Sequence, residues 1–413
     1  MTSLAYKRQG SKHVLMICFV FPPRFSGAAV QALSLATALR ERGVICEFAV
    51  PNFLDRRLYS RTLEHGTLVH RVGRGPWTFA VALFAFLVFG SRRFSTLHIH
   101  GFCKSQFVCV AVGKLFGLRV VQKMTKGGAE NSEFGDGGVL APLRRLALRL
   151  INDFIAISSP LRRGLLSLAL PHSHVHLIPN GVDVQRFAPR SAGDRREMSS
   201  TKDLPADSIL LLCTGVIDKR KNQHLILAAL AELRLRYVNL WERTYLLLAG
   251  PFHNSIYSDR IIRQAGELRL RGRVKFLGSL PQDELAVLNG LCDICVFAGN
   301  NEGLPNVLLE AKAAGKPIIA FRADGVEDIV REGIDGHVVD FGDVAAFTRK
   351  LSELIEDNGL RYRFGQNARL DALERFSIER IADRYMREVY RLDEKEPAGR
   401  PADELAPRRT KIG

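Results

Sequence analysis

The chain has 413 residues, 46% of them hydrophobic and 25% charged, and its formal net charge is +16. This length accommodates two domains of ordinary size, each with its own core, and the composition is normal for a globular protein. The charge would also fit a nucleic-acid-binding protein, but the sequence has no zinc-finger spacing, RNP-like aromatic motif or basic helical run, so nucleic acid is not an expected partner.

The positive excess lies entirely in the N-terminal half. Residues 1–190 carry 25 Lys and Arg against 9 Asp and Glu, whereas residues 191–413 carry 34 of each. A one-sided basic surface attracts anionic partners, and each Lys or Arg near an anionic membrane contributes about 1 kcal/mol. The alternative is a basic surface that serves only solubility.

The first half of the chain alternates apolar strands with helical stretches, which predicts a parallel sheet. Residues 14–21 form an apolar run typical of a strand enclosed on both faces, and residues 28–40 have helical periodicity, with Gly43 as a stop. Because the first residues are polar, we expect a buried first strand here and no secretory signal peptide.

Residues 77–90, WTFAVALFAFLVFG, form a strongly apolar segment. Its 14 residues are fewer than the roughly 20 that span hydrocarbon, so we do not expect a transmembrane helix. Two interpretations remain open. The segment is either a buried helix of the first domain, or a helix in the membrane interface with Arg71, Arg74, Arg92 and Arg93 at the lipid headgroups.

Residues 95–100, STLHIH, predict a strand that ends at His100. At the carboxyl end of a strand in an open α/β sheet, a side chain faces the ligand crevice. A lone histidine is nevertheless more often a packing or surface residue. By strand alternation, we expect His98 on the opposite face of the sheet, in a structural role.

The second half begins with a charged, turn-rich stretch. We interpret residues 191–207 as a linker between a first domain, 1–190, and a second domain, 208–377. A long helical pattern over 378–392 follows, and the charged, proline-containing tail 393–413 is expected to be disordered. Apolar runs predict strands of the second domain at 208–216, 244–250, 273–278, 294–299 and 317–321.

The seven cysteines do not have metal-ligand spacing. Only Cys292 and Cys295 are separated by two residues, and no second pair accompanies them, so a zinc site is not expected. We expect buried free thiols in a reducing compartment. The full set is Cys18, Cys46, Cys103, Cys109, Cys213, Cys292 and Cys295.

Residues 300–320, NNEGLPNVLLEAKAAGKPIIA, carry the strongest functional signal. Glu302 and Glu310 are eight positions apart, which is about two helical turns. If Pro305 opens a helix, the free N–H groups of the turn before it and of its first turn point at one spot, which suits phosphate. Two carboxylates that bracket a diphosphate could each hold a sugar hydroxyl, so the arrangement suits a nucleotide-sugar. The alternative is a surface turn and a core helix with two solvated glutamates.

Seven segments, in the expected order along the chain, resemble the retaining glycosyltransferases of family four, the glycosyl transferases group 1 with the GT-B fold. The resemblance implies an α/β protein of two Rossmann-like domains with parallel sheets that face a central cleft. It implies that the donor lies mainly on the C-terminal domain, the acceptor mainly on the N-terminal domain, and that residues 378–392 cross back to brace the first domain. The matching segments are 19–50, 97–102, 178–183, 214–230, 274–297, 300–320 and 329–340.

The resemblance implies a phosphate ligand at Lys221, which follows Gly215 at the family's spacing of six residues. The family often has arginine directly after this glycine, whereas this chain has Val216, and Arg220 could supply the missing cation. Charge near the leaving diphosphate stabilises it as the glycosidic bond breaks.

The segment after the Lys221 loop completes the expected donor site. The resemblance implies that Glu302 binds hydroxyls of the transferred sugar and that Glu310 binds the ribose diol. Asn306, one turn into the helix, could also reach the donor, and Gly315 is expected to end this helix. The expected backbone contacts come from Gly303, Leu304 and Pro305.

Two positions depart from the family pattern. Gly27 is followed by Ala28 where the family usually has two glycines, so we expect the backbone of this donor loop to approach the diphosphate less closely. Asp324, Gly325 and Asp328 stand where the family commonly shows Gly-Gly and then Glu, which leaves the edge of the donor pocket open.

On the first domain, His100 resembles the family's active-site histidine, which supports the sugar and orients the acceptor. The loop KMTKGGAENSEF follows another strand, and its lysine and two glycines could hold an anion while a glutamate contacts acceptor hydroxyls. The alternative is a flexible loop. The expected acceptor-binding residues are therefore Lys126, Gly127, Gly128 and Glu130.

The expected reaction is a retaining sugar transfer from a UDP- or GDP-linked sugar to an acceptor hydroxyl, with His100, Glu302 and Lys221 as catalytic residues. The family needs no divalent metal, because helix dipoles and basic side chains neutralise the diphosphate, and no cofactor is expected. The basic first half and residues 77–90 favour a lipid-linked saccharide as acceptor and peripheral contact with the anionic inner face of the cell membrane, in the cytoplasm.

Three alternatives remain from the sequence. The acceptor could be a soluble small molecule, or the chain could be a non-catalytic sugar-nucleotide-binding protein. A GT-B epimerase or phosphorylase is disfavoured, the first by the Glu302 segment and the second because no cofactor-lysine context is found.

Overall fold

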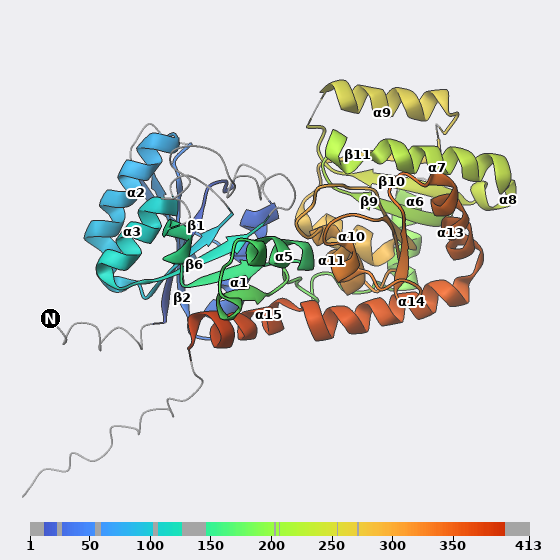
Figure 1. The fold of residues 1–413 in the computed structure, drawn as a ribbon. Helices are drawn as coiled ribbons and strands as arrows, with labels where there is room; N and C mark the ends of the chain where they lie inside the picture. Colours follow the sequence, from blue (N-terminus) through green and yellow to red (C-terminus); the bar gives the residue numbers. More distant parts are fainter. Residues whose placement is uncertain are drawn as a thin grey trace, which may run out of the picture.

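The computed structural model describes residues 12–22, 27–53, 59–101, 106–125, 146–201, 204–205, 207–253, 255–270 and 272–392. It contains two α/β domains that lie side by side, with the C-terminal helices running beneath both (Figure 1). Within the described residues, no helix has the length and apolar character that a membrane crossing requires.

The first domain is built on an eight-stranded sheet with the order β3-β4-β2-β1-β5-β6-β7-β8. Only the β3–β4 pair is antiparallel. The strands are β1 (His13–Cys18), β2 (Ile45–Pro51), β3 (Tyr59–Glu64), β4 (Thr67–Val72), β5 (Thr96–His100), β6 (Arg119–Met124), β7 (Asp153–Ala156) and β8 (Val175–Leu177). The helical elements are α1 (Gly27–Arg40), α2 (Pro76–Gly90), η1 (Ser91–Arg93), α3 (Gln106–Phe116), α5 (Ser159–Ser167) and η3 (His172–His174).

Helices cover both faces of this sheet, which explains why its central strands are apolar throughout. On β1, Leu15 and Ile17 join the core that lies under α2 and α3. Val14 and Met16, which point to the other face, join a core shared with α1 and the C-terminal helices. The expected first strand and first helix are therefore present, and they place the ends of several parallel strands at one edge.

The second domain is built on a six-stranded parallel sheet with the order β11-β10-β9-β12-β13-β14. Its strands are β9 (Ile209–Thr214), β10 (Thr244–Ala249), β11 (Val274–Gly278), β12 (Ile294–Phe297), β13 (Ile318–Phe321) and β14 (Gly336–Val339). The first five lie within the apolar runs that predicted strands, and β14 was not predicted. The helical elements are α6 (Ala192–Thr201), η4 (Lys219–Lys221), α7 (Gln223–Arg236), α8 (Val238–Trp241), α9 (Ser255–Glu267), α10 (Gln282–Leu291), α11 (Asn306–Ala313), α12 (Val326–Ile329), α13 (Val344–Glu356) and α14 (Asn358–Asp371).

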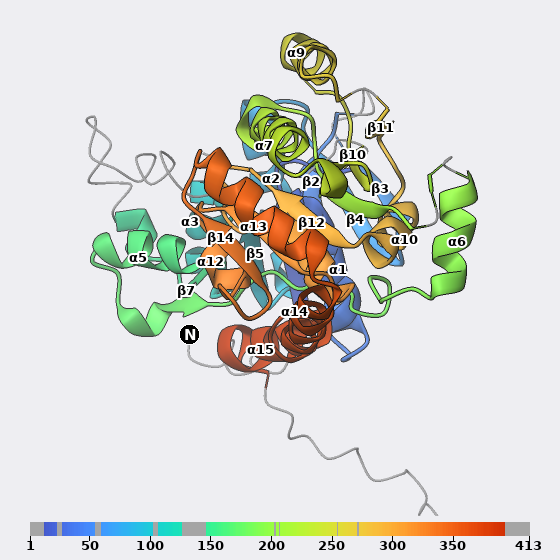
Figure 2. The same ribbon diagram turned by 90° about the vertical axis from the view of Figure 1, so that its right-hand side faces the viewer.

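The linker expected at 191–207 contains helix α6, so it is not simply a turn-rich connection. The Ser191 hydroxyl and the Asp194 carboxylate cap the helix start reciprocally, at 2.9–3.1 Å, in a capping box. Arg195 then donates to the carbonyl of Leu291 at the end of α10 and pairs with Asp293 at 3.0 Å. These bonds fix α6 to the side of the second domain, next to α10 (Figure 2).

The chain returns to the first domain through η5 (Ala372–Phe376), α15 (Ile378–Arg384) and η6 (Tyr385–Tyr390). A pair of backbone hydrogen bonds secures the crossing: Val182 donates to Phe376 at 2.8 Å, and Ile378 donates to Val182 at 3.0 Å. Ile381 and Tyr385 then enter the core next to α1. The structure thus places residues 378–392 on the first domain, as the resemblance implied. Residues 393–413 lie outside the described residues.

Candidate active site

Helix α11 begins one residue later than expected, at Asn306, because Pro305 has the extended ψ of 101° typical of a residue that precedes a helix. Leu304 is buried and anchors the preceding turn. The turn also lies against Gly325, where an added Cβ would be 2.6 Å from the Gly303 carbonyl oxygen. Glycine is therefore required at position 325, whose φ of 76° also favours it. At the far end, Gly315 follows the helix with a φ of 68°, as predicted.

Lys221 lies next to the turn that precedes α11. Its ammonium group pairs with the Glu302 carboxylate at 2.6 Å, and both side chains are about one-fifth exposed. It also lies 5.8 Å from the centre of the buried Phe297 ring. The Lys221 stem passes beside Gly215, whose φ of 129° favours glycine. A cation, a carboxylate and the start of a helix are therefore brought together.

Arg220 does not join this group through its guanidinium. Its side chain is exposed and pairs with Asp218 at 3.3 Å. Its carbonyl instead accepts a hydrogen bond from the backbone of Asn300 at 2.8 Å, which ties the Lys221 loop to the Glu302 loop. Arg220 was expected to supply the cation that is missing at Val216, but in this structure its guanidinium pairs with Asp218.

Glu310 lies on α11 and is half-buried, so it is not a solvated glutamate. Burial raises the pKa of Glu310 to about 7, opposed by a hydrogen bond of 3.4 Å from the Gln282 amide. Near neutral pH the group therefore carries a proton for part of the time, and it can both donate to and accept from a vicinal diol.

The first domain contacts the second domain at the start of α11. The Asn180 amide donates to the Asn306 side-chain oxygen at 2.8 Å. Gly27, the first residue of α1, lies so near that a Cβ on it would be 3.5 Å from the Asn306 amide nitrogen. Gly27 and Asn306, predicted separately as donor-binding residues, are therefore neighbours across the two domains.

The prediction that His98 and His100 face opposite sides of the sheet is wrong. Side chains alternate with a period of two, so residues two apart share a face. Their ring centres are 4.1 Å apart. His98 binds the hydroxyl of Tyr390 at 2.7 Å, which links the middle of β5 to the C-terminal helices.

His100 is 3% exposed, and neither of its ring nitrogens has a hydrogen-bond partner among the described residues. Burial, with smaller contributions from His98 and Lys123, holds the pKa of His100 well below its ordinary value. The ring is thus neutral near pH 7 and presents one donor and one acceptor.

Lys123 is a residue that sequence reasoning missed. It pairs in register with His100 on the neighbouring strand and is 2% exposed. Burial lowers the pKa of Lys123 to about 8, while the adjacent Cys18 opposes this change. Among the described residues its ammonium has no ion pair or hydrogen bond. The available signal was a lysine inside an otherwise apolar strand.

Asp328 lines a hollow together with Asn300 and Gly325, next to the Glu302 turn. Its carboxylate accepts from the backbone N–H of Ser159 at 2.9 Å and from the Ser159 hydroxyl, at the start of α5 in the first domain. This is a contact between domains, and sequence alone gave no indication of the pair. The expected acceptor residues Lys126, Gly127, Gly128 and Glu130 lie outside the described residues.

The described residues contain no group of three or more His, Cys, Asp or Glu that could hold a metal ion. Six cysteines in the same part of the chain are buried and form no disulfide. Burial raises the pKa of the Cys292 thiol to about 12, so it is protonated at neutral pH.

Two family models match this chain. The model for glycosyl transferases group 1 matches residues 194–371, and the model for the glycosyl transferase 4-like domain matches residues 26–181. Together they cover both sheets and the loops of Lys221, Glu302 and His100.

Curated relatives include the lipopolysaccharide core biosynthesis glycosyltransferase LpsE of Rhizobium meliloti, 32% identical over 45% of this chain and 50% of its own. The GDP-mannose-dependent alpha-(1-6)-phosphatidylinositol monomannoside mannosyltransferase of Mycolicibacterium smegmatis is 32% identical over 54% of this chain and 58% of its own. The matches with these relatives thus span about half of their length.

Solved structures share the fold over nearly the whole chain. The Anabaena protein HepE in complex with UDP superposes with a TM-score of 0.76 at 20% identity, covering 91% of this chain and 98% of its own. WaaG, a glycosyltransferase involved in lipopolysaccharide biosynthesis, superposes with a TM-score of 0.65 at 16% identity, covering 90% and 98%. With its two family models and its two parallel-sheet domains in the GT-B arrangement, this chain belongs to the group 1 glycosyltransferases.

Proposed function

We propose that this protein is a retaining, metal-independent hexosyltransferase that moves a sugar from a nucleoside-diphosphate sugar to a hydroxyl of a lipid-linked saccharide at the membrane surface. The observation that carries the proposal is the ion pair of Lys221 and Glu302 at the start of α11, with Glu310 farther along the same helix. A diphosphate at the helix start accepts hydrogen bonds from its free N–H groups, while the Lys221 ammonium offsets its charge.

The donor fits this arrangement in one orientation. With the diphosphate at the helix start, Glu302 accepts from hydroxyls of the sugar and Glu310 binds the ribose diol. The base is uracil or guanine: the HepE structures contain UDP or UDP-glucose, and the mannosyl relative is named for GDP-mannose.

The chemistry requires little covalent participation by the protein. The acceptor hydroxyl attacks from the face that the diphosphate leaves, and the leaving phosphate oxygen takes the hydroxyl proton. Lys221 stabilises the negative charge that develops on this phosphate. Neutral His100 supports the sugar and orients the acceptor by hydrogen bonding. The Asn180–Asn306 bond holds the domains together at the donor and helps to exclude water.

Helix α2 supports an acceptor at a membrane. One of its faces packs on the sheet through the buried Phe79, Leu83 and Leu87. The opposite face is also apolar but exposed, with Trp77 at 81% and Phe89 at 89%. Residues 77–90 thus form a helix that packs on the first domain, and its exposed apolar face is the one that we propose to contact lipid. The basic N-terminal half attracts this face to anionic headgroups.

The test is a panel of UDP-, GDP- and ADP-sugars incubated with the protein, with and without EDTA, and with lipid-linked and soluble saccharide acceptors. We expect free nucleoside diphosphate and a product whose anomeric configuration, read by NMR, equals that of the donor. An inverted product contradicts retention, and loss of turnover in EDTA contradicts metal independence. Equal turnover with the soluble acceptor favours the alternative acceptor class, and absence of release across the panel favours a non-catalytic binder.

A further inference from the structure

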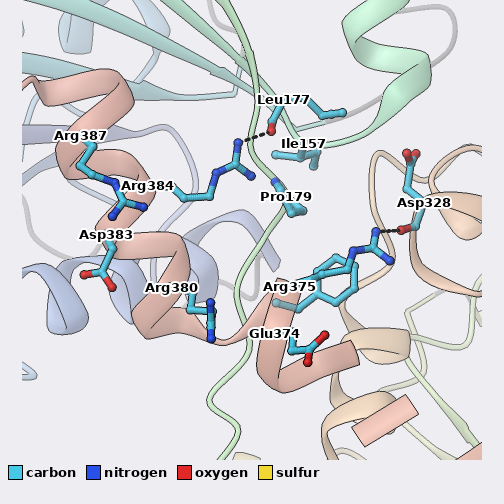
Figure 3. A pocket seen from close by; sticks show the side chains of 11 residues that line it. Ile157, Leu177, Pro179, Asp328, Glu374, Arg375, Arg380, Asp383, Arg384 and Arg387 are labelled. Atoms are coloured by element: carbon cyan, nitrogen blue, oxygen red, sulfur yellow. Dashed lines mark hydrogen bonds between the residues drawn. The ribbon is translucent and has the colours of Figure 1, made fainter. Parts of the chain in front are cut away.

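A second hollow of about 660 Å³ lies where the C-terminal helices cross between the domains (Figure 3). None of its lining residues belongs to the Lys221 or Glu302 loops, so it is separate from the proposed donor site. The lining residues are Ile157, Leu177, Pro179, Asp328, Glu374, Arg375, Phe376, Arg380, Asp383, Arg384 and Arg387.

Three arginines follow one another at helical spacing along this wall: Arg380, Arg384 and Arg387. Arg384 is held in place, since it donates to the Leu177 carbonyl at 2.9 Å and pairs with Glu388 at 2.7 Å. Among the described residues, the guanidinium groups of Arg380 and Arg387 have no hydrogen bond or ion pair, and both side chains are exposed. Two cations therefore remain available at the hollow.

Two of the three carboxylates in the hollow have partners outside it. Asp383 pairs with Arg42 of the first domain, and the Asp328 carboxylate binds Ser159. The third, Glu374, is exposed to solvent. Among the lining residues four arginines face three carboxylates, and Arg380 and Arg387 are the cations for which the described residues provide no partner.

We propose that this hollow binds a phosphorylated small molecule, whose phosphate oxygens accept hydrogen bonds from Arg380 and Arg387 and whose body lies against Leu177 and Pro179. Guanidinium groups suit phosphate because they donate two parallel hydrogen bonds. The volume lies in the range of small-ligand sites, so more than a bare ion fits. The concave shape between two domains and a helix favours a soluble molecule over a flat lipid surface.

Such a ligand would act on the arrangement of the domains. Arg380 and Arg387 lie on the segment whose other side packs in the core of the first domain, with Tyr385. Arg375 and Asp328 belong to the opposite wall, where Arg375 donates to the Asp328 carbonyl at 3.0 Å. A molecule bound to both walls stabilises the relative arrangement of the two domains seen here. The effect on turnover depends on the proposed function, whereas the binding does not.

The test measures binding of pyrophosphate and of glucose 1-phosphate by calorimetry at constant ionic strength. A Lys221→Met background removes binding at the proposed donor site. In this background, the added pair Arg380→Ala and Arg387→Ala should weaken binding at least about tenfold, the size expected from lost charge-assisted hydrogen bonds. The matched control is Arg363→Ala, since Arg363 is an exposed arginine on α14 outside the hollow.

Circular dichroism of the unliganded variants shows whether they fold. If the alanine pair fails to fold, Arg380→Lys with Arg387→Lys replaces it, and binding should again weaken because the paired hydrogen bonds are lost. Unchanged affinity in the arginine variants, an equal loss in Arg363→Ala, or a response to phosphatidylglycerol vesicles but not to either soluble phosphate would overturn the proposal.

Discussion

The two domains each contain a buried lysine, and the two lysines differ in the partners of their ammonium groups. Lys312, on α11 of the second domain, donates to the Ile329 carbonyl at 2.6 Å and to Asp335 at 3.0 Å, and it also pairs with Asp371. Lys123 of the first domain is 2% exposed, and among the described residues its ammonium has no carboxylate partner, only the Tyr385 ring, whose centre is 5.7 Å away. A buried charge without a carboxylate partner is costly, and we interpret its retention as a sign of a functional role.

The comparison extends to the neighbours of each lysine. On the second domain, Lys221 and Glu302 are already paired, and Lys312 anchors the helix that carries Glu310. On the first domain, the part of the chain that the structure describes offers no hydrogen-bond partner to either ring nitrogen of His100. We interpret the second domain as a pre-organised donor half and the first as a half whose polar groups are satisfied when substrate binds.

The largest expected effect tests the anchored lysine. Lys312→Met removes the buried cation from Asp335 and Asp371 and leaves them only the half-exposed Arg331 and Arg375, so it should lower the free energy of unfolding by about 3 kcal/mol. Urea denaturation measures the change. Lys219→Met, at an exposed lysine on η4, should stay within about 0.5 kcal/mol of the wild type. If Lys312→Met lowers the free energy of unfolding only slightly, the buried ion pairs of Lys312 do not stabilise the second domain, and the contrast with Lys123 is lost.

Replacement of Lys123, in contrast, should raise the free energy of unfolding near neutral pH. The folded-state pKa of Lys123, about 8, lies below its ordinary value of 10.5, so the unfolded chain binds more protons between these two pH values. Stability should therefore rise with pH across this window, and the full penalty, about 3 kcal/mol, applies below it.

Lys123→Met removes that penalty, so at pH 7 it should unfold at higher urea concentration than the wild type while its transfer activity falls. Urea midpoints at pH 7 and pH 10, together with kcat at pH 7, measure both effects. Lys114→Met, at an exposed lysine on α3, serves as the control. A variant that is less stable and fully active would show that Lys123 is an ordinary structural residue.

A third prediction concerns the donor half. Lys221→Met removes the cation next to Glu302, and kcat/KM should fall by about tenfold to hundredfold, because the leaving diphosphate loses its charge partner. Lys219→Met, two residues earlier on the same turn, is the matched control and should retain activity. Wild-type turnover in Lys221→Met would refute the assignment of this site.

The smallest expected effect concerns α2. Trp77→Ser combined with Phe89→Ser alters two exposed apolar side chains and should weaken binding to anionic vesicles about tenfold at low salt. Co-sedimentation at two salt concentrations measures this change. Leu235→Ser, at a 71% exposed position of the second domain, should leave vesicle binding unaffected. Equal binding by all three proteins would show that this face of α2 is not the membrane contact, and no binding by any of them would point to a soluble acceptor.

The strands were the elements best predicted from the sequence, because enclosed parallel strands appear as short, continuous apolar runs. Five of the six strands of the second domain lie within predicted runs, while β14 is only four residues long and begins at a glycine, Gly336. Helix α6 was missed although its capping box, Ser191 and Asp194, was visible, because the surrounding charge was typical of a linker.

The donor side was also predictable, because the Lys221 and Glu302 loops carry local motifs that the fold brings together. The contact of Asp328 with Ser159 and the pairing of Lys123 with His100 were not, since both depend on segments that meet only after folding. The error at His98 had a simpler cause, a mistaken application of strand alternation.

A crystal structure of the protein with bound UDP or GDP tests the central claim most directly. The account predicts that diphosphate oxygens lie within hydrogen-bond distance, about 3 Å, of the amides at the start of α11 and of the Lys221 ammonium, with the ribose diol at Glu310. A nucleotide held elsewhere, with the Lys221–Glu302 pair intact and no diphosphate beside it, would contradict the account.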